Sequence, residues 1–265
     1  MDGIRGQIVR GLLLLVVTGV LGLLAEPARA LPTGLTPVIL FDVTDVGSGR
    51  QLYTGRETIR LTGGDLEKKT WYYDAGGKTV QTEEVRFDPG NLVTRYYRLD
   101  NSLTGERALV EFADGRVRVG WRATAKEPFE KKSLVWQKDT ILGKSLHNLI
   151  MQNRGRLSGD QPVEFSLLVP FRQELIDFRV SVAARGKDTV VYRLEPASWI
   201  VRQLVDSMDF TYQAGPPYRL LTYQGPTTIN TRAGDDRQIR IRFRYENGSG
   251  SGGIRPAGGA PVPGR

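Results

Sequence analysis

The feature that most constrains the fold is an alternation of apolar and polar residues on both sides of Asp114-Gly115. A period of two residues is typical of a strand with one buried and one solvated face. Asp-Gly favours a two-residue type I′ turn, because both central residues need a positive φ. The sequence therefore predicts a hairpin of residues 107–113 and 116–124, with Phe112 opposite Val117.

The same pattern of short alternating runs and turns fills most of the chain, and it predicts further strands at residues 70–73, 78–87, 92–99, 161–169, 174–183, 188–194, 218–223 and 237–245. The predicted fold class is mainly β. We expect a single large curved antiparallel sheet or open β-barrel over residues 36–246, with one short helix. In the last strand an Arg row alternates with apolar residues, which is typical of a solvated face and can protect an edge strand from pairing.

The short helix is predicted at residues 145–153, where Leu146, Leu149 and Ile150 fall on one stripe. Ser145 suits the N-cap, and Gly155 is expected to end the helix. Residues 197–205 fit either a strand or a helix, and their pattern favours a strand.

Residues 1–30 have the pattern of a cleavable secretory signal peptide. Arg5 and Arg10 precede an apolar run at residues 11–24, and small residues occupy Ala28 and Ala30. The run is shorter than the roughly 20 residues that cross a bilayer as a helix. We therefore expect a periplasmic or secreted protein, with an uncleaved signal anchor as the alternative. Residues 247–265 are rich in Gly and Pro and predict a disordered tail.

The chain carries a formal charge of +8 and contains no cysteine. In an exported protein, this charge points to an anionic envelope surface as a partner rather than to nucleic acid. The alternative is that the charge serves solubility alone. The sequence leaves the oligomeric state open.

The titratable residues do not form a recognisable catalytic or metal-binding motif. His147 is the single histidine, so neither zinc coordination by paired histidines nor a Ser-His arrangement is indicated, and we expect no cofactor and no metal. Glu83 and Glu84 are neighbours on a predicted strand and should point to opposite faces. The sequence therefore favours a non-enzyme, and a carboxylate-based cell-wall glycan hydrolase remains an alternative.

Large aromatic residues occur on many of the predicted strands, and a curved sheet that carries them on its inner face can enclose a ligand. The predicted ligand-binding residues are Trp71, Phe112, Trp121, Trp136, Phe165 and Trp199. The alternative is that these side chains only fill the core.

Residues 139–194 combine a Leu-rich helix, a Gly-Asp turn and a strand pair, at Leu146, Leu149, Ile150, Gly159, Asp160, Val163, Phe165, Arg185 and Val190. This order resembles an uncharacterised family of bacterial periplasmic antiparallel β-sheet proteins, loosely similar to the LolA and LolB lipoprotein carriers. Residues 210–225 resemble the closing strands of the same family. The chain departs from the anchored relatives by lacking a lipidated cysteine.

The resemblance implies an envelope role, a lipid or other hydrophobic ligand, and no catalytic residue. Three hypotheses stay open at this point: a non-catalytic carrier of a hydrophobic ligand, a structural or assembly partner with a filled core, and a glycan hydrolase.

Overall fold

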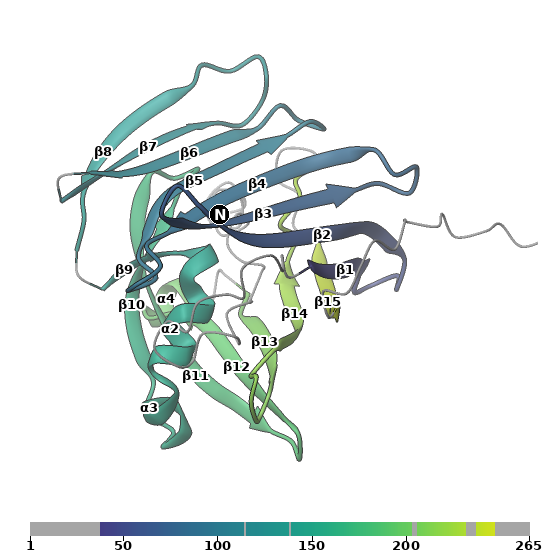
Figure 1. Cartoon of the computed structure of the whole chain (residues 1–265), viewed down its shortest axis with the longest axis vertical. Helices are drawn as coiled ribbons and strands as arrows, with labels where there is room; N and C mark the ends of the chain where they lie inside the picture. Colours follow the sequence, from purple (N-terminus) through teal and green to yellow (C-terminus); the bar gives the residue numbers. More distant parts are fainter. Residues whose placement is uncertain (1–37, 114, 138, 203–205, 232–236, 247–265) are drawn as a thin grey trace, which may run out of the picture.

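The computed structural model describes residues 38–246, apart from residues 114, 138, 203–205 and 232–236. The predicted signal peptide and the predicted C-terminal tail lie outside the described residues. Within the described part, the chain is mainly β and forms one large sheet of 15 strands that is not closed (Figure 1).

The strands are β1 (Val38–Asp45), β2 (Gln51–Thr62), β3 (Asp65–Tyr73), β4 (Thr79–Phe87), β5 (Thr94–Asn101), β6 (Arg107–Ala113), β7 (Arg116–Arg122), β8 (Glu130–Val135), β9 (Thr140–Leu142), β10 (Val163–Val169), β11 (Glu174–Arg185), β12 (Thr189–Pro196), β13 (Met208–Gln213), β14 (Leu220–Pro226) and β15 (Gln238–Glu246). Their order in the sheet is β8-β7-β6-β5-β4-β3-β2-β1-β15-β14-β13-β12-β11-β10-β9.

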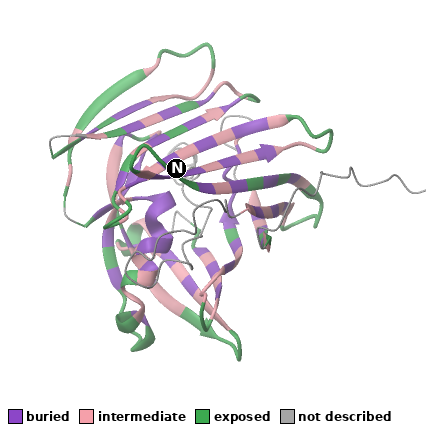
Figure 2. Ribbon diagram, in the orientation of Figure 1, coloured by how far each residue is buried: buried purple, intermediate pink, exposed green. Residues whose placement is uncertain are grey.

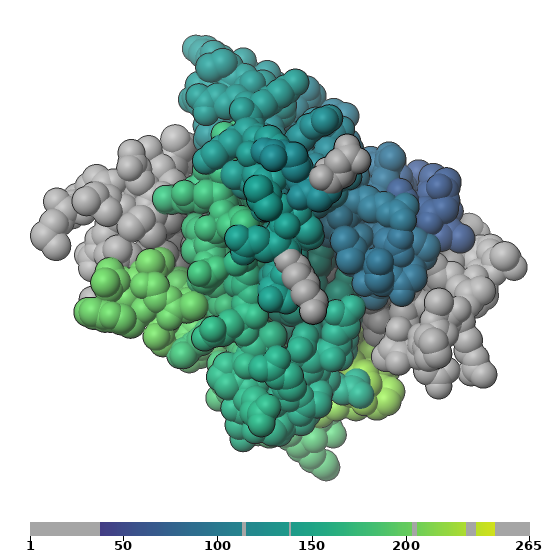
Figure 3. Space-filling model, turned by 90° about the vertical axis from the view of Figure 1, so that its left-hand side faces the viewer, coloured from purple at the N-terminus to yellow at the C-terminus, as the bar shows by residue number. Residues whose placement is uncertain are grey.

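Most neighbours in the sheet are also neighbours in sequence, because short turns join antiparallel strands. Two connections depart from this pattern. β1 pairs with β15, which brings the first and last strands together in the middle of the sheet. β9 pairs in parallel with β10, and β8 and β9 form the two edges. Figure 3 views the molecule from the side of these edges, and the teal part of the chain covers that side from top to bottom.

The sheet curves around a helical segment that lies on its concave side (Figure 1). This segment comprises η1 (Gly143–Ser145), α2 (Leu146–Gln152) and α3 (Arg154–Ser158). Its side chains reach both halves of the sheet. Asn148 Nδ2 donates to the Leu92 carbonyl before β5, and His147 Nδ1 lies 3.2 Å from the Tyr212 hydroxyl on β13. The helical segment therefore bridges the two halves and fills part of the concavity.

The burial pattern confirms the predicted alternation along the strands (Figure 2). In β15, Ile239, Ile241 and Phe243 are buried, and Arg242 and Arg244 are exposed on the other face. The Arg row therefore lies on a solvated face, as predicted, but it does not protect an edge, because β15 pairs with both β1 and β14. Pairing of β1 with β15 joins residues about 200 positions apart, which no local pattern reveals.

The predicted hairpin is confirmed in both strands and register. β6 pairs with β7, and Phe112 lies opposite Val117. Gly115 has a φ of +69°, as the turn requires, and Asp114 lies outside the described residues.

Three predictions about the helical residues need correction. Gly155 does not end the predicted helix: α2 stops before Asn153, and Gly155 lies within α3. Ser145 takes the N-cap position of α2, as predicted, but its hydroxyl bonds Thr94 Oγ1 on β5 and makes no capping hydrogen bond. Residues 199–202, predicted as part of a strand, form the single helical turn α4 (Trp199–Arg202).

One close contact shows how tightly the inner layer is packed. The ring of Phe41 on β1 lies directly over Gly55 on β2, where a Cβ atom would come within 2.0 Å of the ring. The same ring packs edge-on against Tyr72, with centroids 5.1 Å apart. Gly55 is required here because any larger residue would displace Phe41 from the core.

Candidate functional site

The concave face of β2, β3 and β4 carries a row of polar side chains in place of a purely apolar surface. Glu57 lies opposite Thr70, and Thr70 lies opposite Glu83. All three are buried, and Thr70 Oγ1 donates to Glu57 Oε2 at 2.9 Å. A buried carboxylate costs much free energy unless it is paired and hydrogen-bonded, so this row needs specific partners.

Glu83 obtains its partners from three different elements. Lys144 Nζ, on η1, lies 2.7 Å from Glu83 Oε2, and both side chains are 5% exposed. Gln81 Nε2 donates to Oε1 at 3.0 Å, and the Tyr97 hydroxyl donates to Oε2 at 3.3 Å. The carboxylate is therefore an anchor that ties the helical segment to the sheet. Glu84, its neighbour, is partly exposed on the opposite face, as predicted.

A second buried lysine lies beside this row. Lys68 Nζ is 3.9 Å from Glu57 Oε1, and its side chain is 4% exposed. Burial lowers the pKa of Lys68 to about 8, although the negative charge of Glu57 opposes the shift. The positive charge of Lys144 lowers this pKa further. Two lysines and two glutamates thus share one water-poor region.

His147 lies close to the same region. Its ring stacks on Tyr212, with centroids 5.5 Å apart. Burial lowers the pKa of His147 to about 3, and the positive charge of Lys68 adds to the effect. At neutral pH this histidine is uncharged and belongs to the packed interior.

The polar row continues through amide side chains to a third carboxyl group. Asn101 Nδ2 donates to Gln81 Oε1 at 3.2 Å and to the Asn230 carbonyl at 2.9 Å. Glu106 accepts hydrogen bonds from Trp121 Nε1 at 3.2 Å and Asn230 Nδ2 at 2.9 Å. Burial raises the pKa of Glu106, and these two bonds oppose the shift without cancelling it.

Glu106 also lines a pocket of about 280 Å³. Buried Gln81, Asn101 and Glu106 are among the residues that line it, together with the less buried Asp100 and Arg122. A pocket with convergent polar groups and a carboxyl of shifted pKa is a candidate binding site. Gln81 belongs both to this pocket and to the buried Glu83 cluster, so the two are directly connected.

Three buried polar atoms near the row have no hydrogen-bond partner of ordinary geometry among the described residues. They are Glu57 Oε1, the Tyr72 hydroxyl oxygen and Thr228 Oγ1. Burial, together with the charge of Glu83, holds the pKa of Tyr72 well above its usual range. These atoms keep hydrogen-bonding capacity in the interior, which is uncommon in folded proteins.

The predicted aromatic residues do not form one site. Phe112 and Trp136 pack edge-to-face with centroids 4.5 Å apart, and Trp121 packs against Phe171 at 6.1 Å. Phe165 is buried in the core, opposite Phe178 of β11.

Two of these residues, Trp71 and Trp199, were expected to face inward but do not. Trp71 shares the outward face of β3 with Glu67 and Lys69, because Thr70 and Tyr72 take the inward positions. Trp199 is 64% exposed on α4. Of the six, only Trp121 contacts the candidate pocket within the described part of the chain, through its bond to Glu106.

The sequence interpretation missed Glu57, Lys68, Glu83, Lys144 and Glu106 as site residues. A signal for Lys68 was present, because it shares its strand parity with Leu66 and Tyr72, both of which are buried. A charged residue at an inward position of a strand marks a buried polar site. The sequence around Lys144 gave no such signal, because Lys144 lies on η1 and meets Glu83 of β4 only in the folded structure.

No helix within the described ranges is long and apolar enough to cross a membrane. The part of the chain that the structure describes also contains no group of three His, Cys, Asp or Glu side chains placed to hold a metal ion. No protein-family model and no curated protein sequence matches this chain.

Proposed function

We propose that this protein is exported to the cell envelope and acts as a non-catalytic binding protein, whose ligand occupies the pocket at Glu106. The observation that carries the proposal is the Glu106 carboxyl group, which is buried in a pocket and fixed by Trp121 and Asn230. Each of its oxygens accepts one hydrogen bond from the protein and has a further lone pair for a ligand.

The residues that line the pocket define the chemistry of the ligand. Glu106 favours a hydroxyl or ammonium donor, whereas Arg122 favours a phosphate or carboxylate. The amides of Gln81 and Asn101 are held by internal bonds and shape the pocket. The volume suits a small polar molecule or the polar head group of a lipid, and it is too small for a whole lipid. The ligand proposed here is therefore more polar than the one the sequence suggested.

The contacts of Asp100, which lines the pocket, and of Glu83, which lies outside it, favour binding over catalysis. Asp100 is engaged by both Arg98 and Arg107, which leaves neither oxygen without a charged partner. Glu83 is buried in its ion pair with Lys144. The second carboxylate in the pocket lining, Asp100, is thus held by two arginines, and this arrangement favours binding over catalysis.

The test uses sn-glycerol 3-phosphate, which combines hydroxyl donors with an anionic group. Calorimetric titration of the purified protein should show binding, and Glu106→Gln or Arg122→Gln should weaken it about tenfold to a hundredfold. Glu111→Gln, on the outward face of β6, is the matched control and should bind normally. Short-chain phosphatidylglycerol distinguishes a lipid head group from a free polar ligand. Absence of binding to both compounds would reject the proposed ligand class.

A glycan hydrolase is the second candidate, because the pocket contains two carboxyls whose pKa values move in opposite directions. Burial raises the pKa of Glu106. Burial also tends to raise the pKa of Asp100, but hydrogen bonds from Arg98 and Arg107 outweigh burial, so the pKa of Asp100 is lowered. Such a difference is typical of an acid and base pair. Release of reducing ends from a soluble cell-wall glycan, lost in Glu106→Gln, would favour this candidate over simple binding.

A further inference from the structure

The outward face of β6, β7 and β8 carries an excess of positive charge. Its basic residues are Arg107, Arg116, Arg118, Arg122 and Lys131, named here the β6–β8 basic face. Glu111 is the acidic residue among the outward positions of these strands. The three strands form the top of the molecule in both views (Figures 1 and 3).

The register places like charges against each other on this face. Arg107 lies directly opposite Arg122, an arrangement that destabilises a sheet. Arg107 Nε donates to Asp100 Oδ1, which offsets part of this repulsion, and Arg122 Nε donates to the Gly105 carbonyl. Arg116 Nε donates to the neutral Ser133 hydroxyl. Arg118 lies opposite Glu111, so Arg116 and Arg122 are the β7 arginines that have no carboxylate at a paired position within the described strands.

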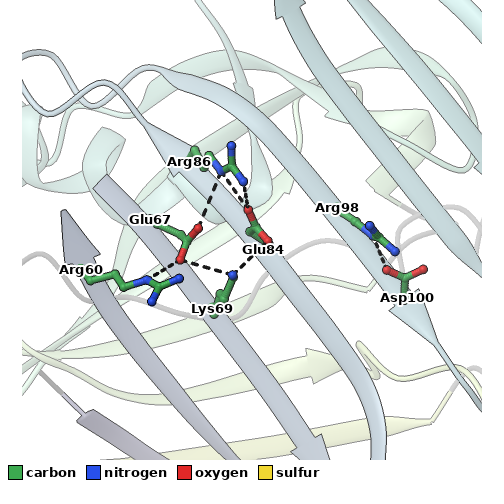
Figure 4. Close-up of polar contacts among 7 residues, drawn as sticks. All are labelled: Arg60, Glu67, Lys69, Glu84, Arg86, Arg98 and Asp100. Carbon is green, nitrogen blue, oxygen red and sulfur yellow. Dashed lines mark hydrogen bonds and ion pairs between the residues drawn. The ribbon is translucent and has the colours of Figure 1, made fainter. Parts of the chain in front are cut away.

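The outward face of β2, β3 and β4 is different, because its charges compensate one another (Figure 4). Arg60 Nε lies 2.7 Å from Glu67 Oε1, and Arg86 Nη2 lies 2.6 Å from Glu84 Oε1. Lys69 Nζ lies 3.4 Å from both carboxylates. The excess of positive charge on β6–β8 is thus a local property and not a general feature of the sheet.

Apolar groups accompany the basic residues. Val135, opposite Arg116 on the edge strand β8, is 62% exposed. The ring of Phe129 lies over Gly120 on the outward side, where a Cβ would come within 2.4 Å of it. Basic residues around exposed apolar groups are typical of surfaces that lie on a lipid bilayer.

We propose that the β6–β8 basic face docks on the surface of an anionic lipid bilayer. The partner is chosen by charge complementarity, since anionic head groups attract clustered Lys and Arg within about a Debye length. Arg122 also lines the pocket, so docking would place the pocket mouth beside the head groups. Arg122 belongs to both the basic face and the pocket, whereas Arg116, Arg118 and Lys131 belong to the basic face alone, so substitutions at Arg116 and Arg118 test docking separately from ligand binding.

Co-sedimentation of the purified protein with vesicles tests the docking. Binding is expected to mixed phosphatidylglycerol–phosphatidylcholine vesicles, to fall with added salt, and to be absent with phosphatidylcholine alone. Arg116→Glu with Arg118→Glu should weaken binding about 30-fold, from about 1 kcal/mol for each basic residue near the surface. Arg122 stays intact, so the pocket is unchanged.

The matched control is Arg240→Glu with Arg242→Glu, which makes the same change of charge on the outward face of β15. Arg240 bonds the neutral Gln224 side chain, much as Arg116 bonds Ser133. The affinity of this control variant for the mixed vesicles should fall by less than about threefold. If both double variants lose the same affinity for vesicles, the binding depends on net charge and not on the β6–β8 basic face, and the proposal is overturned.

Two further outcomes would also overturn the proposal: no binding of the unmodified protein to the mixed vesicles, or equally tight binding to soluble polyglutamate, which would point to an acidic protein partner. Circular dichroism checks that each variant is folded. If the double variant unfolds, the single variant Arg118→Gln replaces it in the vesicle assay, and its affinity should fall about fivefold.

Discussion

Replacing Lys144 by Met should strongly destabilise the fold, because it leaves the Glu83 carboxylate buried without its charged partner. At the observed 2.7 Å, an effective dielectric constant of about 20 gives a gross attraction of about 6 kcal/mol. Gln81 and Tyr97 still donate to Glu83 in the variant and recover part of this. The expected net loss in the free energy of unfolding is about 3–5 kcal/mol.

Urea unfolding followed by circular dichroism measures this loss. Lys126→Met, at an exposed position before β8, is the control and should change stability by less than about 0.5 kcal/mol. Adding Glu83→Gln to Lys144→Met removes the unpaired Glu83 charge and should restore about 2 kcal/mol of the free energy of unfolding. A Lys144→Met loss below about 1 kcal/mol, or a double variant that loses the full sum of the single losses, would refute the role given to this ion pair.

Three further predictions follow from single contacts. Gly55→Ala should cost about 1–3 kcal/mol in urea unfolding, because its Cβ would overlap the Phe41 ring, and Phe41→Leu in the same chain should restore part of the loss; unchanged stability contradicts the packing. The pKa of His147 is about 3 in the folded protein against an ordinary value of 6.5, so the unfolded chain binds the extra proton below pH 6.5. Stability should therefore fall by up to about 4–5 kcal/mol between pH 6.5 and 3, and His147→Gln should flatten this part of the profile; an equally steep profile in the variant contradicts the assignment. Phe165→Ala should cost about 3–5 kcal/mol and Trp199→Ala less than about 0.5 kcal/mol in thermal or urea unfolding, and the reverse order would contradict their burial.

The alternation of residues along each strand was enough to predict the class of the fold and much of its local pairing. The register of Phe112 with Val117 followed from the turn, because a two-residue loop leaves a single pairing consistent with one buried face. The helical turn at Trp199 was missed because four residues are too few for a period to distinguish helix from strand.

The candidate site was much less predictable. The search for a ligand site followed large aromatic residues, but those residues serve mainly as core, as with Phe165, or lie on the outer surface, as with Trp199. The site is built instead from polar side chains that meet only in the folded sheet. Lys144 reaches Glu83 across 61 positions of sequence, and Asn230 reaches Glu106 across 124. Spacing within one strand or helix cannot reveal contacts over such separations.

Native mass spectrometry of the protein recovered from a bacterial periplasm without detergent tests the central claim most directly, with Glu106→Gln prepared in parallel. The proposal predicts a chain that begins at Leu31 and carries a small bound mass, which is removed by organic extraction or denaturation and is absent from the variant. A bare polypeptide mass in the unmodified protein, still unshifted after addition of sn-glycerol 3-phosphate or short-chain phosphatidylglycerol, would contradict it. An identical bound mass in both proteins would move the ligand away from Glu106.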